Sequence, residues 1–349
     1  LAETGRRSEA LTTTDEAVTI YRQLAQDNPA AYEPNLAGSL SNLGIRLAQA
    51  GRHGEALTTE QEAVEIRRRL AQDNPAAYEP NLATSLSNLG IRLAQAGRHG
   101  EALTTAEEAV EIRRRLAQDN PAAHEPDLAG SLSNLGNRLA EAGRHDEALT
   151  TAEEAVEIRR RLAQDNPAAY EPNLATSLSN LGIRLAEAGR HDEALTTEQE
   201  AVEIRRRLAQ DNPAAYEPDL ATSLSNLGNR LAEAGRHDEA LTTAEEAVEI
   251  RRRLARDNPA AHEPNLATSL TVLAMLLAAK SDLYEALRAT EEAVDLHYRH
   301  VATAPPLLPR LHAVMGLQAN LLERLGLQEE SETVRRWLRE NPLPPDSHA

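Results

Sequence analysis

The thirteen residues SLSNLGIRLAEAG, from Ser177 to Gly189, decide how this chain folds, because nearly the same stretch occurs five times. The other four copies begin at Ser39, Ser85, Ser131 and Ser223. A second pattern, Glu-Pro-Asn/Asp-Leu, recurs at the same spacing, and each step, such as Asn35 to Asn81, is 46 residues long. A fixed period of this length is typical of a tandem array in which each copy packs on its neighbours.

Each unit contains two helical patterns. The first is predicted from about Pro80 to Ala96, with the proline in its first turn and Gly97 as its C-cap. Its apolar positions fall on one face: Leu82, Leu86, Leu89 and Leu93. The second is predicted from about Gly100 to Gln118 and is followed by a linking segment, DNPAAHEP, that starts at Asp119.

Neither helix can bury its apolar stripe alone, so the sequence predicts an all-α solenoid of stacked helix–turn–helix units. Four parts are expected along the chain. Residues 1–34 are a truncated partial N-terminal repeat, 35–310 are six tandem 46-residue repeats, 311–340 are a C-terminal capping helix pair, and 341–349 are a disordered tail.

Composition narrows the classes of partner. The formal charge is −18, with 55 acidic against 37 basic residues, which disfavours nucleic acid and anionic membrane. The sequence contains no cysteine, so disulfides and thiolate metal sites are excluded. No signal peptide and no long apolar run occur, and the expected location is the cytoplasm. Arginine supplies nearly all the bases, with Lys280 the single lysine, which favours a GC-rich bacterial gene.

No pattern indicates catalysis or a cofactor. There is no Gly-rich phosphate loop, no nucleophile elbow and no convergent carboxylate pair, so we predict a protein that is not an enzyme. The recurring histidines, such as His99, stand 46 residues apart, one in each turn between helices, and are interpreted as turn residues rather than metal ligands. The run Arg113–Arg115 follows several glutamates and is predicted to form a solvated charged face.

The pattern Leu86-x2-Leu89-Gly90-x2-Leu93, followed by Gly97, Ala102 and Ala109, resembles the tetratricopeptide repeat (TPR) signature. Glu60, Ala106, Ala152, Glu198 and Ala244 stand where the family has a bulky aromatic residue. The 46-residue period is similar to the long, kinesin light chain type of repeat and to arrays in bacterial STAND and caspase-like (CHAT) signalling proteins. The resemblance implies a right-handed α-α superhelix that serves protein binding.

The resemblance further implies that the first helix of each unit lines a concave groove. The positions facing that groove are predicted from helical spacing, and an asparagine recurs among them. The candidate peptide-binding residues are Asn42, Asn88, Asn134, Asn180, Asn226, Thr84, Ile91, Asn137, Thr176, Ile183, Thr222 and Asn229. A primary amide both donates and accepts, so this row can bind peptide backbone. The alternative is that each asparagine bonds a neighbouring helix.

These observations favour a non-catalytic scaffold that binds a protein or peptide, as the recognition array of a larger signalling or regulatory protein. Two alternatives stay open. The array is a self-association module that forms homo-oligomers, or it is the non-catalytic domain of an enzyme whose catalytic part lies upstream.

Overall fold

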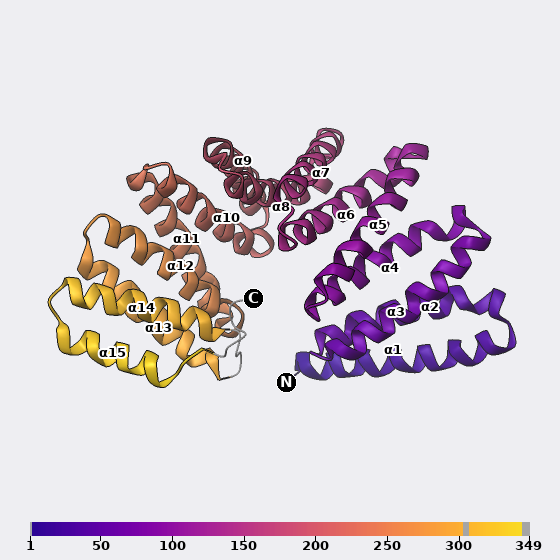
Figure 1. Ribbon diagram of the computed structural model, residues 1–349, viewed down its shortest axis with the longest axis horizontal. Coiled ribbons are helices and arrows are strands. Elements are labelled where there is room, and N and C mark those ends of the chain that lie inside the picture. The colour runs from indigo at the N-terminus through magenta and orange to yellow at the C-terminus, as the bar shows by residue number, and fades with distance from the viewer. Residues whose placement is uncertain (1, 303–306, 344–349) are drawn as a thin grey trace. The chain divides into compact units, whose positions relative to one another are not determined.

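The computed structural model describes residues 2–302 and 307–343, and those residues form helices and no strand (Figure 1). Every second helix is called a helix A. Helices A are α2 (Pro29–Gln49), α4 (Pro75–Gln95), α6 (Pro121–Glu141), α8 (Pro167–Glu187), α10 (Pro213–Glu233), α12 (Pro259–Ala279) and α14 (Leu308–Arg324). The expectation of an all-α helix–turn–helix solenoid is confirmed.

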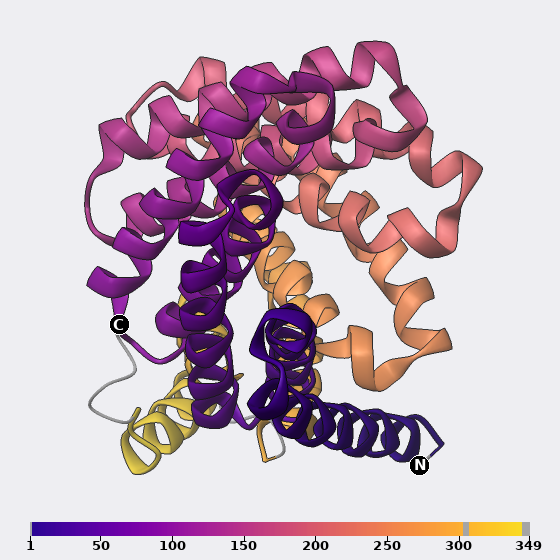
Figure 2. The same cartoon turned by 90° about the vertical axis from the view of Figure 1, so that its right-hand side faces the viewer.

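The alternating elements are called helices B. They are α1 (Ala2–Asp27), α3 (His53–Asp73), α5 (His99–Asp119), α7 (His145–Asp165), α9 (His191–Asp211), α11 (His237–Asp257), α13 (Leu283–Val301) and α15 (Gln328–Glu340). Each A–B pair forms a helical hairpin closed by a short turn, and several of these turns are visible at the margins of the rotated view (Figure 2).

The chain divides into two compact units, Leu1–Tyr170 and Glu171–Ala349. Inside each unit, successive helices pack against one another, as α2 with α3 in the first unit and α10 with α11 in the second. Helices A of successive repeats also touch, as α4 with α6 in the first unit and α10 with α12 in the second. No two helices B make contacts of that extent among the described residues. Helices A therefore form the inner layer of each unit.

The connection between repeats differs from the sequence prediction. Helix α4 begins at Pro75, not near Pro80, and a single residue, Asn74, separates it from α3. The Asn74 side chain accepts a hydrogen bond from the Ala77 amide at 3.3 Å, which caps the helix. Pro80 therefore lies inside the helix, where it removes one backbone hydrogen bond. The predicted linking segment is mostly helix, because an N-cap and an N1 proline start a new helix at once.

The turn inside each hairpin agrees with the prediction. Gly97 has φ +73°, a left-handed conformation that glycine adopts without a Cβ clash, and the Arg98 amide closes the turn on the Leu93 carbonyl at 2.9 Å. The equivalent glycines Gly51, Gly143, Gly189 and Gly235 have the same sign of φ. In the sixth repeat, Ser281 takes this conformation at φ 66°.

The predicted leucine stripe is the core of each repeat. Leu86 is fully buried, and Leu82, Leu89 and Leu93 are nearly so. Gly90 lies where two helices approach each other, and a Cβ there would make an ordinary van der Waals contact at 3.4 Å with the Ala102 carbonyl oxygen. Burying a leucine contributes about 2 kcal/mol, so four per repeat supply much of the stability of the array.

At the C-terminal end of the second unit, helix α14 packs on α13 and helix α15 packs on α14. Leu311 and Val314 are fully buried there, and the rings of His312 and Trp337 have centroids 5.5 Å apart. The predicted disordered tail begins at residue 341, and its residues 344–349 lie outside the described part of the chain.

Candidate functional site

The five recurring asparagines lie on helices A, in the inner layer of each unit. Asn42, Asn88 and Asn134 belong to the first unit, and Asn180 and Asn226 to the second. Asn42 is exposed and the other four are half-buried. None of the five side chains makes a hydrogen bond with any other described residue. Their amides are therefore not used to fasten one helix to the next.

The threonines of the predicted set are already engaged. Thr84 Oγ1 donates to the Pro80 carbonyl oxygen at 3.0 Å and accepts from Arg113 Nη2 at 3.1 Å. Thr222 has the equivalent arrangement with Arg251 at 3.1 Å, and Thr176 with Arg205 at 3.4 Å. These hydroxyls are thus held by arginines of helices B, which leaves less of their bonding capacity for a ligand.

The remaining predicted residues, Ile91, Asn137, Ile183 and Asn229, are all half-buried on helices A. They lie one helical turn after the recurring asparagine of the same helix. Each helix A that carries the recurring asparagine therefore presents an amide next to either a branched apolar side chain or a second amide.

A row of serine hydroxyls joins successive helices A, and sequence reasoning missed it. The Oγ atoms of Ser41 and Ser85 lie 2.9 Å apart, and those of Ser87 and Ser131 lie 3.1 Å apart. In the second unit Ser179 meets Ser223 at 3.1 Å. The signal was present in the pattern Ser-x-Ser, since residues two apart on a helix lie on opposite flanks and can reach the helices on either side.

The first arginine of each EIRRR run contradicts the prediction of a solvated face. Arg113 is only 7% exposed, whereas Arg114 and Arg115 are exposed and pair with Glu154 and Glu79. Its guanidinium is directed to helices A, where it meets Thr84 and, at 2.9 Å, the Asp127 carboxylate. Burial lowers the pKa of Arg113, and the nearby Asp127 opposes that shift.

A buried carboxylate accompanies the arginine in the repeat of α2 and α3. Glu60, 1% exposed, accepts a hydrogen bond from Ser41 Oγ at 3.0 Å. Arg67 Nη1 donates to the same Ser41 hydroxyl at 3.2 Å, to the Asn81 carbonyl oxygen at 3.2 Å and to Ser85. Burial raises the pKa of Glu60, while hydrogen bonds from the serines and the charge of Arg67 oppose the shift.

The second unit repeats this arrangement around Glu198, which is 2% exposed. Ser179 donates to the Glu198 carboxylate at 3.1 Å, and Arg205 donates to Ser179 at 3.0 Å and to Ser223. Burial raises the pKa of Glu198 as well. The sequence signal was the glutamate at the place of the family's aromatic residue, and only packing shows that its carboxylate turns inward to the serines.

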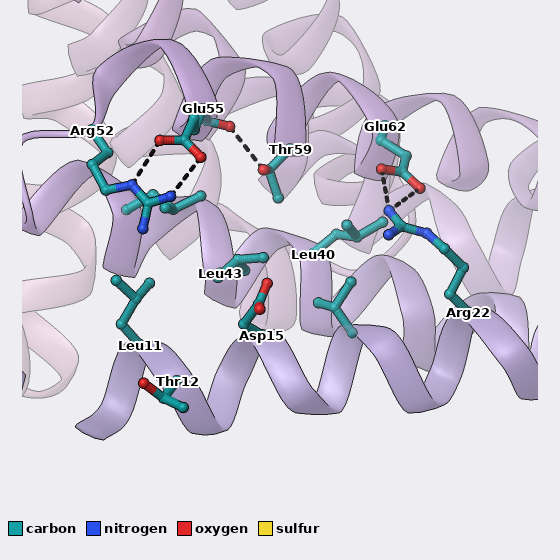
Figure 3. A pocket seen from close by; sticks show the side chains of 12 residues that line it. Leu11, Thr12, Asp15, Arg22, Leu40, Leu43, Arg52, Glu55, Thr59 and Glu62 are labelled. Atoms are coloured by element: carbon teal, nitrogen blue, oxygen red, sulfur yellow. Dashed lines mark hydrogen bonds and ion pairs between the residues drawn. The ribbon is translucent and has the colours of Figure 1, made fainter. Parts of the chain in front are cut away.

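The outer side of each unit has grooves between successive helices B. Figure 3 shows the first of them, between α1 and α3, with a volume of about 350 Å³. Arg22 Nη2 crosses this groove and donates to both carboxylate oxygens of Glu62, at 2.8 and 2.7 Å. Arg52 pairs with Glu55 at its other end (Figure 3). The chain's own ion pairs therefore line this groove.

The described residues contain no group of three or more side chains able to hold a metal ion. The recurring histidines, such as His99, are the first residues of helices B. No helix within residues 2–302 and 307–343 has the length and apolar character needed to span a bilayer.

Family models agree with this architecture. Two models described as tetratricopeptide repeat match the chain, one over residues 127–207 and the other over residues 36–76, 82–122 and 220–260. No curated protein matches the chain significantly.

Solved structures with the same fold include BtubC (BKLC) from P. vanneervenii, 22% identical, with a TM-score of 0.58, covering 71% of this chain and 92% of that one. The TPR-like repeats of a kinesin light chain candidate from Podosopora anserina are 22% identical, with a TM-score of 0.51, over 64% of this chain and 98% of that one. These likenesses show the fold alone.

A STAND signal-transduction ATPase with a tetratricopeptide repeat sensor, from Pyrococcus horikoshii, aligns with 97% of this chain at 14% identity and a TM-score of 0.62. This chain spans 49% of the length of that protein. The matched family residues cover more than half of the sequence, and the resemblance drawn from its leucine, glycine and alanine pattern is confirmed. The chain belongs to the tetratricopeptide repeat family.

Proposed function

We propose that this chain is a non-catalytic scaffold that binds an extended segment of a partner protein along the inner layer of helices A. The observation that carries the proposal is the row of asparagine amides, which recurs on α2, α4, α6, α8 and α10 and makes no hydrogen bond within the described residues. Amides left unpaired at an accessible surface are available to a peptide backbone, which presents both a donor and an acceptor at each residue.

The neighbouring side chains support an extended ligand rather than a point contact. Each asparagine lies beside either an isoleucine, as at Ile91, or another asparagine, as at Asn137. A ligand side chain would therefore contact an apolar residue on some helices A and a polar residue on others. The role of recognition array in a larger signalling or regulatory protein belongs to this proposal and is compatible with the fold shared with the STAND sensor.

The test selects peptides from a displayed library on the intact chain and measures their affinity by fluorescence polarisation. The variant changes Asn88, Asn134, Asn180 and Asn226 to alanine. Each asparagine removed is expected to weaken peptide binding roughly fivefold, since one hydrogen bond contributes about 1 kcal/mol net.

The matched control changes Thr58, Thr104, Thr150 and Thr242 to alanine. These exposed hydroxyls lie on helices B and bond only their own helix backbone. The control is expected to bind peptides as tightly as the unchanged chain does. If the asparagine variant also kept that affinity, a peptide-binding inner layer would be contradicted.

A further inference from the structure

The grooves between helices B follow one rule through the array. An arginine of one helix B reaches a glutamate forty residues later on the next helix B. The described pairs are Arg22–Glu62, Arg68–Glu108, Arg114–Glu154, Arg206–Glu246 and Arg252–Glu292. An arginine guanidinium therefore crosses each of these grooves and ends at a carboxylate.

The groove between α13 and α15 breaks the rule. At the positions 46 residues later, Tyr298 replaces the arginine Arg252 and Leu338 replaces the glutamate Glu292. By the same spacing, Trp337 is equivalent to Glu291. This groove has a volume of about 460 Å³ and is lined by Glu291, Val294, Asp295, Tyr298, Met315, Gln318 and Trp337. No cation is among these lining residues, whereas Arg22 and Arg52 line the groove in Figure 3.

The lining combines aromatic faces, an apolar floor and acidic groups. Tyr298 is 59% exposed, Trp337 is half-buried and Met315 is 8% exposed. Asp295 is paired with Arg299, but Glu291 is exposed and has no ion-pair partner among the described residues. Aromatic faces beside a carboxylate attract a guanidinium more strongly than either feature alone, because the ring quadrupole and the carboxylate are both negative toward the cation.

We infer that this groove binds an arginine side chain supplied by a partner polypeptide. The aliphatic part of that side chain lies on Val294 and Met315, and its guanidinium lies between Tyr298, Trp337 and Glu291. The occupant is inferred from the other grooves, in which the chain itself supplies the arginine, and from the formal charge of −18, which attracts basic segments. The site is built from α13–α15, which carry none of the recurring asparagines, so it is separate from the proposed inner-layer site.

Trp337 is the single tryptophan of the chain, so its fluorescence reports on this groove directly. The probe is the blocked peptide acetyl-Gly-Leu-Arg-Leu-Gly-amide, titrated into the full chain. The comparison peptide has citrulline in place of arginine, which keeps the shape and removes the charge. We expect a saturable change in emission with the arginine peptide and at least roughly tenfold weaker binding of the citrulline peptide. No saturable change, or equal affinity for both peptides, would overturn the inference.

Two variants keep the test specific. Glu291→Gln is expected to weaken the arginine peptide roughly tenfold, since it removes the unpaired carboxylate. Its matched control is Glu245→Gln, the exposed equivalent one repeat earlier, which is expected to leave the affinity unchanged. The double variant Tyr298→Arg with Leu338→Glu rebuilds the internal ion pair of the other grooves. It is expected to abolish peptide binding while retaining the helical circular dichroism spectrum.

Two other occupants are distinguishable in the same experiment. A change in Trp337 emission on deletion of residues 344–349, with no peptide present, would show that the chain's own end fills the groove. A change in emission with protein concentration alone would show that a second copy does so. Either result would overturn an arginine-bearing partner as the occupant.

Discussion

Two junctions between repeats hold the equivalent arginine in different ways, with Arg67 half-buried and Arg113 buried. At the junction of α2, α3 and α4, Glu60 is buried, and Arg67 donates to Ser41 and to Ser85 of the next helix A. At the junction of α4, α5 and α6, Ala106 replaces that glutamate, and Arg113 reaches Thr84 at 3.1 Å and Asp127 at 2.9 Å. The carboxylate that offsets the buried charge therefore comes from helix B at one junction and from helix A at the other.

A third junction shows what happens when both carboxylates are missing. Near Arg251, Ala244 stands at the position of Glu60 and Asn265 at the position of Asp127. Arg251 donates instead to the Asn265 carbonyl oxygen and to Thr222. Burial, and next the charge of Arg310, lower the pKa of Arg251 to about 10. An arginine at this position is thus tolerated with neutral acceptors, but its charged form is less favoured there.

Removing the arginine should be the most damaging change. Arg205→Met leaves the Glu198 carboxylate buried with serine donors and without the cation that most favours its charged form. The loss of stability is expected to be about 3–5 kcal/mol, the usual cost of an uncompensated buried charge. Native-state hydrogen exchange of the amides of α8–α10 measures it. The control is Arg206→Met, whose exposed pair with Glu246 contributes less than about 1 kcal/mol. Similar losses for the two variants would contradict the assigned network.

The junctions that contain Glu60 and Glu198 are called the two Glu junctions, and removing the glutamate should distinguish them. In the Glu60→Ala variant, no other side chain can take over the role of the lost carboxylate beside Arg67. The position equivalent to Thr84 is Gly38, and the position equivalent to Asp127 is Asn81. A loss of about 2 kcal/mol is expected from urea unfolding.

At the second Glu junction Thr176 and Asp219 are available to Arg205, so Glu198→Ala is expected to cost about 1 kcal/mol or less. Adding Asn81→Asp to Glu60→Ala should restore most of the loss, because it recreates the Arg113–Asp127 arrangement. Failure of this rescue would show that the two solutions are not interchangeable.

The buried glutamates predict a pH dependence of stability. Burial raises the pKa of Glu60 and of Glu198 above the value in the unfolded chain, so the folded protein binds more protons between the two values. The stability contribution of these groups is therefore greatest below the unfolded pKa and decreases as the pH rises through the folded pKa. Relative to the double variant Glu60→Gln and Glu198→Gln, the unchanged protein should lose stability as the pH rises above the unfolded glutamate pKa of about 4.3. A difference that grows in the opposite direction would be inconsistent with burial as the dominant cause.

The smallest effect concerns the glycine at the closest helix approach. A Cβ on Gly44 would lie 3.2 Å from Glu60 Oε2, whereas one on Gly228 would lie no nearer than 3.5 Å, to the Ala240 carbonyl oxygen. Gly228→Ala is expected to be neutral or stabilising by up to about 1 kcal/mol, because alanine favours the helix. Gly44→Ala should lose that gain by displacing the Glu60 carboxylate. Thermal unfolding compares the two, and an equal gain at both sites would contradict the tighter packing of the Glu junction.

The sequence determined the repeat, the helix pairs and the core of this protein. The period, the glycine turns such as Gly97 and the leucine stripe of Leu82 to Leu93 are local patterns. Such patterns depend on backbone geometry within one or two helices, so they can be interpreted without knowing the neighbours. Helical spacing also placed the recurring asparagines on one face, and that face is accessible on helices A.

Only the tertiary structure decided how the polar side chains on the flanks of the helices are used. Arg113 and Arg114 are adjacent arginines in one run, yet one is buried against Thr84 and Asp127 and the other crosses an exposed groove. Residues next to each other on a helix point about 100° apart, so their surroundings depend on which neighbouring helix covers each direction. The same reason applies to Glu60, whose burial follows from the approach of α2 and α4, which no local pattern specifies.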